Sequence, residues 1–211
     1  MSFSKLYIPL IHSFIVREHV ERALGNISLF LDKCFLEIKM KFEDLGLSNE
    51  LLEAIKREKI ETPTLIQEES IPPILEGKDV IGESATGSGK TLAFGAGIIE
   101  NTVHGKGIQA LVLTPTRELA EQVKTALARF SYKKLNCVAI YGGVSINPQM
   151  HDLVKADVVV GTPGRLLDHL ERRTIDLSKV KILVLDEADR MLDMGFIDDV
   201  EKIIRVCPRV R

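Results

Sequence analysis

The stretch that most restricts this chain runs from Asp79 to Thr91 and reads Asp-Val-Ile-Gly-Glu-Ser-Ala-Thr-Gly-Ser-Gly-Lys-Thr. A short apolar pair, Val80 and Ile81, precedes a loop of small residues, and a helix-compatible segment follows over 92–100. A strand, a glycine-rich turn and a helix start form an anion cradle, because backbone N–H groups can approach phosphate oxygens where no side chain intervenes. The pattern predicts a nucleoside triphosphate site and does not by itself select a reaction.

The end of this loop supplies a charge and a hydroxyl group. Lys90 is expected to contact the β- and γ-phosphates, and Thr91 to place its hydroxyl on Mg²⁺. The general pattern has a glycine six positions before the lysine, and Ser84 stands there instead. A chance turn with a surface lysine is the competing interpretation, and the expected strand and helix on either side argue against it. The predicted nucleotide-binding residues are Ser84, Ala85, Thr86, Gly87, Ser88, Gly89, Lys90 and Thr91.

Downstream, apolar runs alternate with amphipathic segments. The runs predict strands at 108–114, 137–141, 157–161 and 180–185, and the segments between them predict helices. Strands that alternate with helices form right-handed crossovers, so we expect an α/β fold with a mostly parallel sheet and helices on both faces. Ligands of such sheets bind beyond the carboxyl ends of the strands.

An acidic sequence follows the last predicted strand. Asp186 is the predicted Mg²⁺ ligand, through a water molecule, and Glu187 is the candidate to orient or deprotonate the water that attacks the γ-phosphate. With Lys90 these two residues form the predicted catalytic set. Asp189 is a candidate for hydrogen bonds that join this site to neighbouring elements. A solvated acidic loop that caps the next helix at Arg190 is the competing interpretation.

Three other loops combine a helix start or a glycine turn with a hydroxyl or a guanidinium group. Such groups bind phosphate and ribose and leave the base unread. The chain has no Trp, 5% aromatic residues and a net charge of −2, so neither a base-stacking platform nor an overall positive field is expected. Each motif alone is as well explained by a helix cap, and the three together favour a nucleic-acid backbone. The residues are Thr116, Arg117, Gly142, Gly143, Thr162, Pro163, Gly164 and Arg165.

A helix is also expected just upstream of the phosphate loop. Thr62 is the predicted cap of a helix that begins at Pro63, and Pro72 and Pro73 are expected to end or bend it. Gln67 then lies one turn into this helix. A lone glutamine is usually a solvated surface residue, but its amide offers one donor and one acceptor, which match N7 and N6 of adenine.

The remaining features concern the compartment and the start of the chain. Cys34, Cys137 and Cys207 share no metal-ligand or redox spacing, which indicates reduced thiols and a cytoplasmic protein. The apolar stretch at 6–16 is too short and too interrupted to span a bilayer. Residues 1–39 carry no chemical motif, and we interpret them as an extension of unknown role or as an upstream misreading of the start codon.

The ordered motifs resemble the N-terminal RecA-like domain of the DEAD-box ATP-dependent RNA helicases. The resemblance covers about 40–211, and its matching positions are Phe42, 63–67, 84–91, 115–120, 142–143, 162–165 and 186–189. It implies a P-loop NTPase fold, ATP and Mg²⁺ as cofactors, Phe42 packed against adenine and Gln67 reading it. It also implies that Thr116, Arg117, Gly143, Thr162 and Arg165 line an RNA path.

The resemblance further implies how the chain is organised. Residues 1–39 are an extension, 40–68 a Q-motif region and 69–211 a first RecA-like domain, incomplete because a Ser-Ala-Thr motif and a second RecA-like domain are expected beyond Arg211. Lys59 and Ile60 stand where the family has a glycine and an aromatic residue. We expect a monomer that alone binds Mg·ATP weakly, hydrolyses it very slowly and does not unwind RNA. A non-unwinding RNA clamp and a DNA helicase or translocase are the alternatives.

Overall fold

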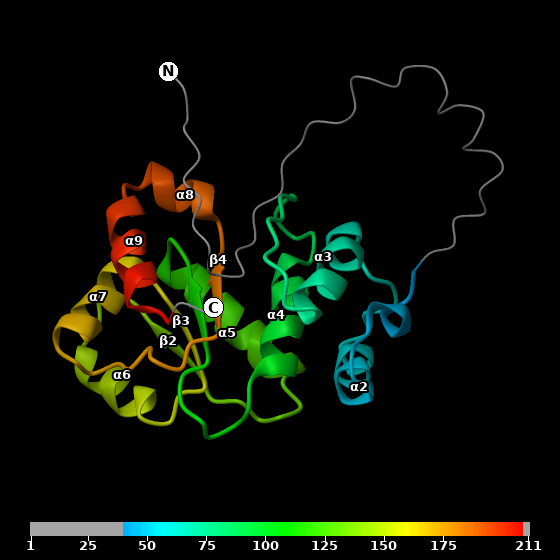
Figure 1. Cartoon of the computed structure of the whole chain (residues 1–211), viewed down its shortest axis with the longest axis horizontal. Helices are drawn as coiled ribbons and strands as arrows, with labels where there is room; N and C mark the ends of the chain where they lie inside the picture. Colours follow the sequence, from blue (N-terminus) through cyan, green and yellow to red (C-terminus); the bar gives the residue numbers. More distant parts are fainter. Residues whose placement is uncertain (1–39, 209–211) are drawn as a thin grey trace, which may run out of the picture.

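The computed structural model describes residues 40–208 (Figure 1), so the predictions for 1–39 and for the end of the chain lie outside it. Across this range no helix has the length and apolar character needed to cross a membrane. The elements, in chain order, are η1 (Phe42–Leu45), α2 (Asn49–Arg57), α3 (Leu65–Leu75), α4 (Lys90–Asn101), β1 (Ala110–Leu113), α5 (Arg117–Phe130), β2 (Cys137–Ile140), α6 (Ile146–Leu153), β3 (Val158–Gly161), α7 (Pro163–Glu171), β4 (Ile182–Leu185), α8 (Ala188–Asp193) and α9 (Ile197–Val206).

The four strands form one parallel sheet in the order β2-β3-β1-β4. β1 lies between β3 and β4, with Ala110 opposite Val158 on one side and Ile182 on the other. The register of β2 with β3 is also parallel. The predicted parallel α/β sheet is therefore confirmed, and the loops that follow all four strands lie at one edge of it.

Alternate residues of the strands face opposite layers of helices, which Figure 1 shows on the two sides of the sheet. Ala110 and Val112 of β1 are buried against α4 and α5, in a cluster that includes Phe94 and Val123. Leu111 and Leu113 are buried on the other face, against α7, α8 and α9. The period of two along β1 thus separates two cores, and the prediction of helices on both faces is correct.

A third apolar cluster attaches the segment before the phosphate loop. Side chains of η1, α2 and α3 pack on the face of α4 that carries Leu92, Ala96 and Ile99. α3 approaches α4 so closely that a Cβ on Gly97 would lie 2.2 Å from Ile74. The predicted boundary between the segments 40–68 and 69–211 falls inside α3, so both segments contribute residues to this helix.

Two local predictions upstream of residue 82 are wrong. Val80 and Ile81 are not part of a strand in the described chain. Ile81 is half exposed, and the sheet of the described residues, β2-β3-β1-β4, does not include this segment, so it has no partner for a hydrogen-bonded ladder.

The helix start was also predicted too early. Thr64, and not Thr62, is the N-cap of α3, and its side chain and that of Gln67 form a capping box. Pro72 and Pro73 lie inside this helix, which continues to Leu75 because their carbonyl groups still accept hydrogen bonds from Glu76 and Lys78. A proline removes a donor and leaves the acceptor in place.

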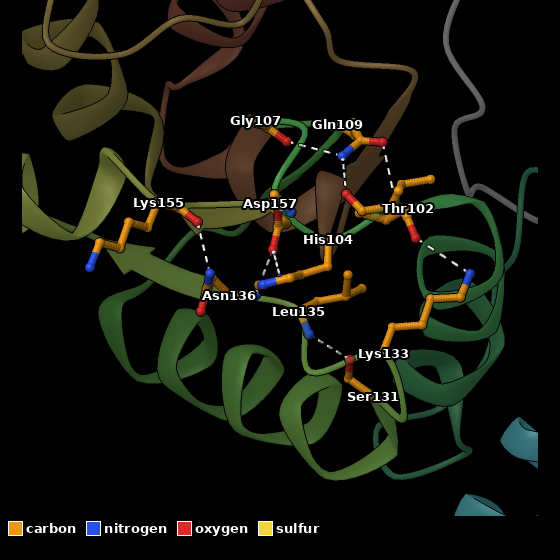
Figure 2. Close-up of polar contacts among 12 residues, drawn as sticks. Thr102, His104, Gly107, Gln109, Ser131, Lys133, Leu135, Asn136, Lys155 and Asp157 are labelled. Atoms are coloured by element: carbon orange, nitrogen blue, oxygen red, sulfur yellow. Dashed lines mark hydrogen bonds and ion pairs between the residues drawn. The ribbon is translucent and has the colours of Figure 1, made fainter.

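A buried carboxylate joins three segments at the opposite, amino-terminal edge of the sheet (Figure 2). Asp157, just before β3, is fully buried. Its Oδ2 accepts from His104 Nδ1 at 2.9 Å and from the Asn136 amide at 2.9 Å, and its Oδ1 accepts from the Gly105 amide at 2.7 Å. This carboxylate ties the loop after α4 and the loop before β2 to the start of β3.

Candidate functional site

The predicted phosphate loop ends at the N-terminus of α4. Gly87 and Gly89 have φ values of +82° and +93°, which favour glycine, and Gly89 is the N-cap of α4. Lys90 Nζ donates a hydrogen bond to the carbonyl oxygen of Ser84, and the hydroxyl oxygens of Ser84 and Ser88 lie 2.6 Å apart. The ammonium group of Lys90 thus lies inside the phosphate loop, where it contacts the backbone of the loop.

Gln67 is held against the phosphate loop. It is 3% exposed, its Oε1 accepts from the Thr64 amide at 3.0 Å, and its Nε2 donates to the Gly89 carbonyl at 3.0 Å. Thr64 Oγ1 also donates to the Ser88 carbonyl at 2.7 Å. Both ends of the Gln67 amide are therefore engaged within the chain, and a contact with adenine would require these bonds to be exchanged.

Phe42 lies in the same layer, within the apolar cluster of η1, α2 and α3. Its side chain is only 4% exposed. The structure thus places Phe42 and Gln67 on neighbouring elements, and a contact of the Phe42 ring with adenine stays a prediction.

One cavity of about 700 Å³ joins the phosphate loop to the acidic residues after β4. Its lining includes residues 82–86 and Lys90 on one side and Asp186, Glu187 and Arg190 on the other. The Asp186 amide donates to the Leu113 carbonyl at 2.9 Å, which keeps the start of this acidic segment fixed to β1. Residues separated by about a hundred positions in the sequence therefore meet at the predicted edge.

Asp186 is a buried acid without an ion-pair partner within 4 Å among the described residues. Burial, and then the neighbouring Glu187, raise its pKa to about 6, while Lys90 acts in the opposite direction. Such a carboxylate is an oxygen ligand of the kind that Mg²⁺ prefers, whereas Thr91, in the first turn of α4, does not line the cavity. Within 40–208 no three acidic, His or Cys side chains form a closed metal cage. An ion held there would complete its shell with water and phosphate oxygens, as Mg²⁺ commonly does.

Glu187 has an unusual backbone conformation. Its φ of 53° and ψ of 50° lie in the left-handed region, which costs a non-glycine residue about 1–3 kcal/mol. It occupies the N-cap of α8, and its Oε2 lies 3.0 Å from Nη1 of Arg190. Asp189 is exposed, and its side chain makes no hydrogen bond with the described residues. The role predicted for Asp189, joining this site to neighbouring elements by hydrogen bonds, therefore stays a prediction.

The predicted nucleic-acid loops follow the other three strands at this edge. Thr116 Oγ1 accepts from the Leu119 amide at 3.3 Å and so caps α5, while the exposed Arg117 guanidinium lies 5.0 Å from the ring centre of Tyr141. Gly142 and Gly143 form an exposed turn after β2. Thr116 therefore acts as an ordinary helix cap and leaves Arg117 at the surface.

The loop after β3 is connected to the glycine turn. Thr162 is the N-cap of α7, Pro163 is its buried first residue and Gly164 is exposed. Arg165 Nη2 donates to the Val144 carbonyl at 2.9 Å, and its Nε lies 3.7 Å from Asp168. The Nη1 atom of Arg165 is buried without a partner among residues 40–208. The structure thus joins two of the predicted loops through one guanidinium group.

Two buried side chains at this edge escaped the sequence analysis. Gln149 of α6 and His169 of α7 are 6% and 0% exposed, and they contact each other and the end of β2. No motif or spacing marks them, because a glutamine and a histidine on amphipathic helices are usually solvated. Only their burial separates them from surface residues.

His169 predicts a pH dependence of stability. Burial, and then Arg165, lower its pKa from the ordinary 6.5, while Asp168 opposes the shift. Below pH 6.5 the unfolded chain binds a proton that folded His169 resists, so the free energy of unfolding should fall as the pH decreases. One such group contributes a slope of at most about 1.4 kcal/mol per pH unit. The free energy of unfolding, measured in urea between acidic and neutral pH, should depend more steeply on pH in the unmutated chain than in His169→Gln. The same pH dependence in both proteins would contradict the prediction.

The parallel sheet, the glycine loop at a helix N-terminus and the acidic end of β4 define a RecA-like P-loop NTPase domain. Residues 64–211 match the family model of the DEAD/DEAH box helicases. The chain belongs to this family.

Curated relatives and a solved structure agree with this assignment. The ATP-dependent RNA helicases CshA of Limosilactobacillus reuteri and of Listeria monocytogenes are 52% and 49% identical over 80% and 81% of this chain. The alignments cover 35% and 34% of those relatives, so the chain spans about a third of their length. The crystal structure of a DEAD box protein from Methanococcus jannaschii superposes with a TM-score of 0.78 at 47% identity, over 80% of this chain and 47% of that one.

Proposed function

We propose that this chain is the ATP-binding domain of an ATP-dependent RNA helicase. It binds Mg·ATP in the cavity between the phosphate loop and the end of β4, and it binds the RNA backbone along the loops after the other three strands. The proposal rests on the observation that Lys90, Asp186 and Glu187 line the same cavity. The names of the curated relatives support the choice of ATP and RNA.

The phosphate loop, the start of α4 and the acidic residues after β4 each have a role in this proposal. Lys90 leaves the Ser84 carbonyl and contacts the β- and γ-phosphates, which offer it a stronger, charged partner. Asp186 and the Thr91 hydroxyl hold Mg²⁺, and the ion supplies neutralisation of the phosphate charge. Glu187 orients or deprotonates the attacking water. The loop from Ser84 to Gly89 surrounds the phosphates with its backbone N–H groups.

Hydrolysis and strand separation require a second RecA-like domain in this proposal. The support is that the chain spans about a third of the length of its CshA relatives. A further domain would supply arginine residues that stabilise the transition state, and it would close over ATP and RNA. The chain alone then binds Mg·ATP weakly and does not unwind a duplex. We place this activity in a cytoplasmic monomer. The free thiols of Cys137 and Cys207, among residues 40–208, support a reducing compartment and do not bear on the oligomeric state.

Equilibrium binding of fluorescent ATP and GTP to the chain, with Mg²⁺, tests the proposal. The unmutated chain should prefer ATP, and Gln67→Ala should reduce the preference by about tenfold, the effect of losing a hydrogen-bonding amide. Lys90→Ala is the matched control and should lose binding of both nucleotides. Equal binding of ATP and GTP by the unmutated chain would remove the adenine argument, and binding that Lys90→Ala leaves unchanged would place the nucleotide elsewhere.

A further inference from the structure

The turn formed by Gly142 and Gly143 has no support of its own. Both glycines are exposed, Gly143 has a φ of +80°, and a Cβ added to either would meet nothing within 4 Å. No hydrogen bond among the described residues involves either of them. A turn of this kind takes a single conformation only if the residues on its two sides are held.

Two helices hold the carbonyl groups on either side of the turn. Before it, Gln149 Nε2 of α6 donates to the Tyr141 carbonyl at 3.1 Å. After it, Arg165 Nη2 of α7 donates to the Val144 carbonyl at 2.9 Å. The four-residue loop is therefore fixed at both ends by side chains that come from different elements.

His169 fixes the orientation of Gln149. Because Gln149 Nε2 donates to a carbonyl, its Oε1 faces His169 Nε2, at 3.3 Å, and this nitrogen must carry the hydrogen. In a neutral ring Nδ1 is then the acceptor, and it lies 2.8 Å from the Thr174 hydroxyl. The bonds run in one direction from His169 Nε2 through Gln149 to the Tyr141 carbonyl, while the Thr174 hydroxyl beside Nδ1 also donates to the His169 carbonyl at 3.2 Å.

The burial of this chain of bonds argues that it does more than fill space. Gln149 and His169 are 6% and 0% exposed, beside an apolar core. Buried polar groups are costly unless each finds a partner, and apolar side chains of similar size would avoid that requirement. The structure meets this requirement for partners because Gln149 Nε2 donates to the Tyr141 carbonyl, in the loop that carries Gly142 and Gly143.

We propose that Gln149 and His169 are positioning residues for the RNA strand that passes the Gly142–Gly143 turn. They do not touch the strand. They hold the turn in the conformation in which its exposed backbone can meet phosphate and ribose groups. The inference rests on the proposed RNA-binding function, and it adds two residues from α6 and α7 to that site.

Fluorescence anisotropy with a short labelled oligouridylate and NMR order parameters of the Gly142 and Gly143 amides, both on the full 211-residue chain, test the proposal. Gln149→Met keeps about the same volume and His169→Phe replaces the imidazole with a larger apolar ring. Each removes a donor, so each should weaken RNA binding by roughly fivefold to tenfold. The order parameters of the two glycines should fall from rigid values, about 0.85, to below about 0.6. His169→Gln keeps an amide donor near the position of Nε2 and should retain most of the affinity and the order.

Leu153→Ala is the control for a merely structural effect. It removes a buried side chain of the same helix α6, so it should lower the urea midpoint while RNA affinity and the order of the turn stay unchanged. The proposal is overturned if Gln149→Met binds RNA like the unmutated chain and its glycines stay rigid. If the unmutated chain does not bind RNA, the proposed function fails, and the order parameters alone decide whether the turn is held: rigid glycines in Gln149→Met overturn the positioning role, and mobile ones support it.

Discussion

Glu187→Gln should stop ATP hydrolysis while leaving ATP bound. In a chain that carries both RecA-like domains, we expect kcat to fall by about 10²–10⁴-fold, the usual contribution of a general base. The amide has nearly the shape of the carboxylate but cannot accept a proton from water. It still lines the cavity without removing Lys90 or Asp186, so the phosphates and the metal keep their proposed ligands. Single-turnover hydrolysis measured beside equilibrium ATP binding separates the two effects.

Asp193→Asn is the matched control for this change. Asp193 also lies on the segment that follows β4, at the end of α8, and it is exposed without a side-chain partner among the described residues. It loses the same charge, so any long-range electrostatic effect should appear in both variants. Normal hydrolysis by Glu187→Gln would show that another group activates the water. A loss of ATP binding in that variant would show that Glu187 holds the nucleotide or its metal.

Asp157→Asn should destabilise the fold, although it replaces only one side-chain oxygen with an amide nitrogen. The buried carboxylate accepts three N–H donors, from His104, Gly105 and Asn136. An amide at this position presents its own N–H groups to at least one of them, so a buried donor loses its acceptor. We expect the free energy of unfolding to fall by about 1–3 kcal/mol, the range for a buried donor that loses its acceptor. This is a large part of the 5–15 kcal/mol typical of a whole domain.

Urea denaturation of the chain at neutral pH measures this effect. Asp152→Asn makes the same chemical change on the exposed side of α6, and it should alter stability by less than about 0.5 kcal/mol. A loss below about 1 kcal/mol in Asp157→Asn would mean that water replaces the missing acceptor and that the three loops do not depend on this carboxylate. ATP binding by the folded fraction should be unchanged, because Asp157 lies at the edge of the sheet opposite the cavity.

The periodic parts of this fold could be read directly from the sequence. All four downstream strands lie where apolar runs predict them, and β1 and β3 are buried along their whole length, which requires a continuous apolar run. Parallel pairing follows from the helices between the strands, and it brings Asp186 to the same edge as the loop residues Thr116, Gly142 and Thr162. Local pattern was enough to place the strands and helices, and the general rule for parallel sheets then placed the strand ends at one edge.

Contacts between distant segments were decided only by the tertiary structure. Val80 and Ile81 are residue types that favour strands, but they have no partner strand among residues 40–208. The hydrogen bond from the Gln67 amide depends on Gly89, which belongs to a different element. The bonds between Gln149 and His169 likewise need α6 and α7 to pack side by side. The sequence by itself determined the order of the motifs and the alternation of strands and helices. The partner of each buried polar group was decided by packing, because a hydrogen bond depends on distance and direction in space, which residue type and spacing do not specify.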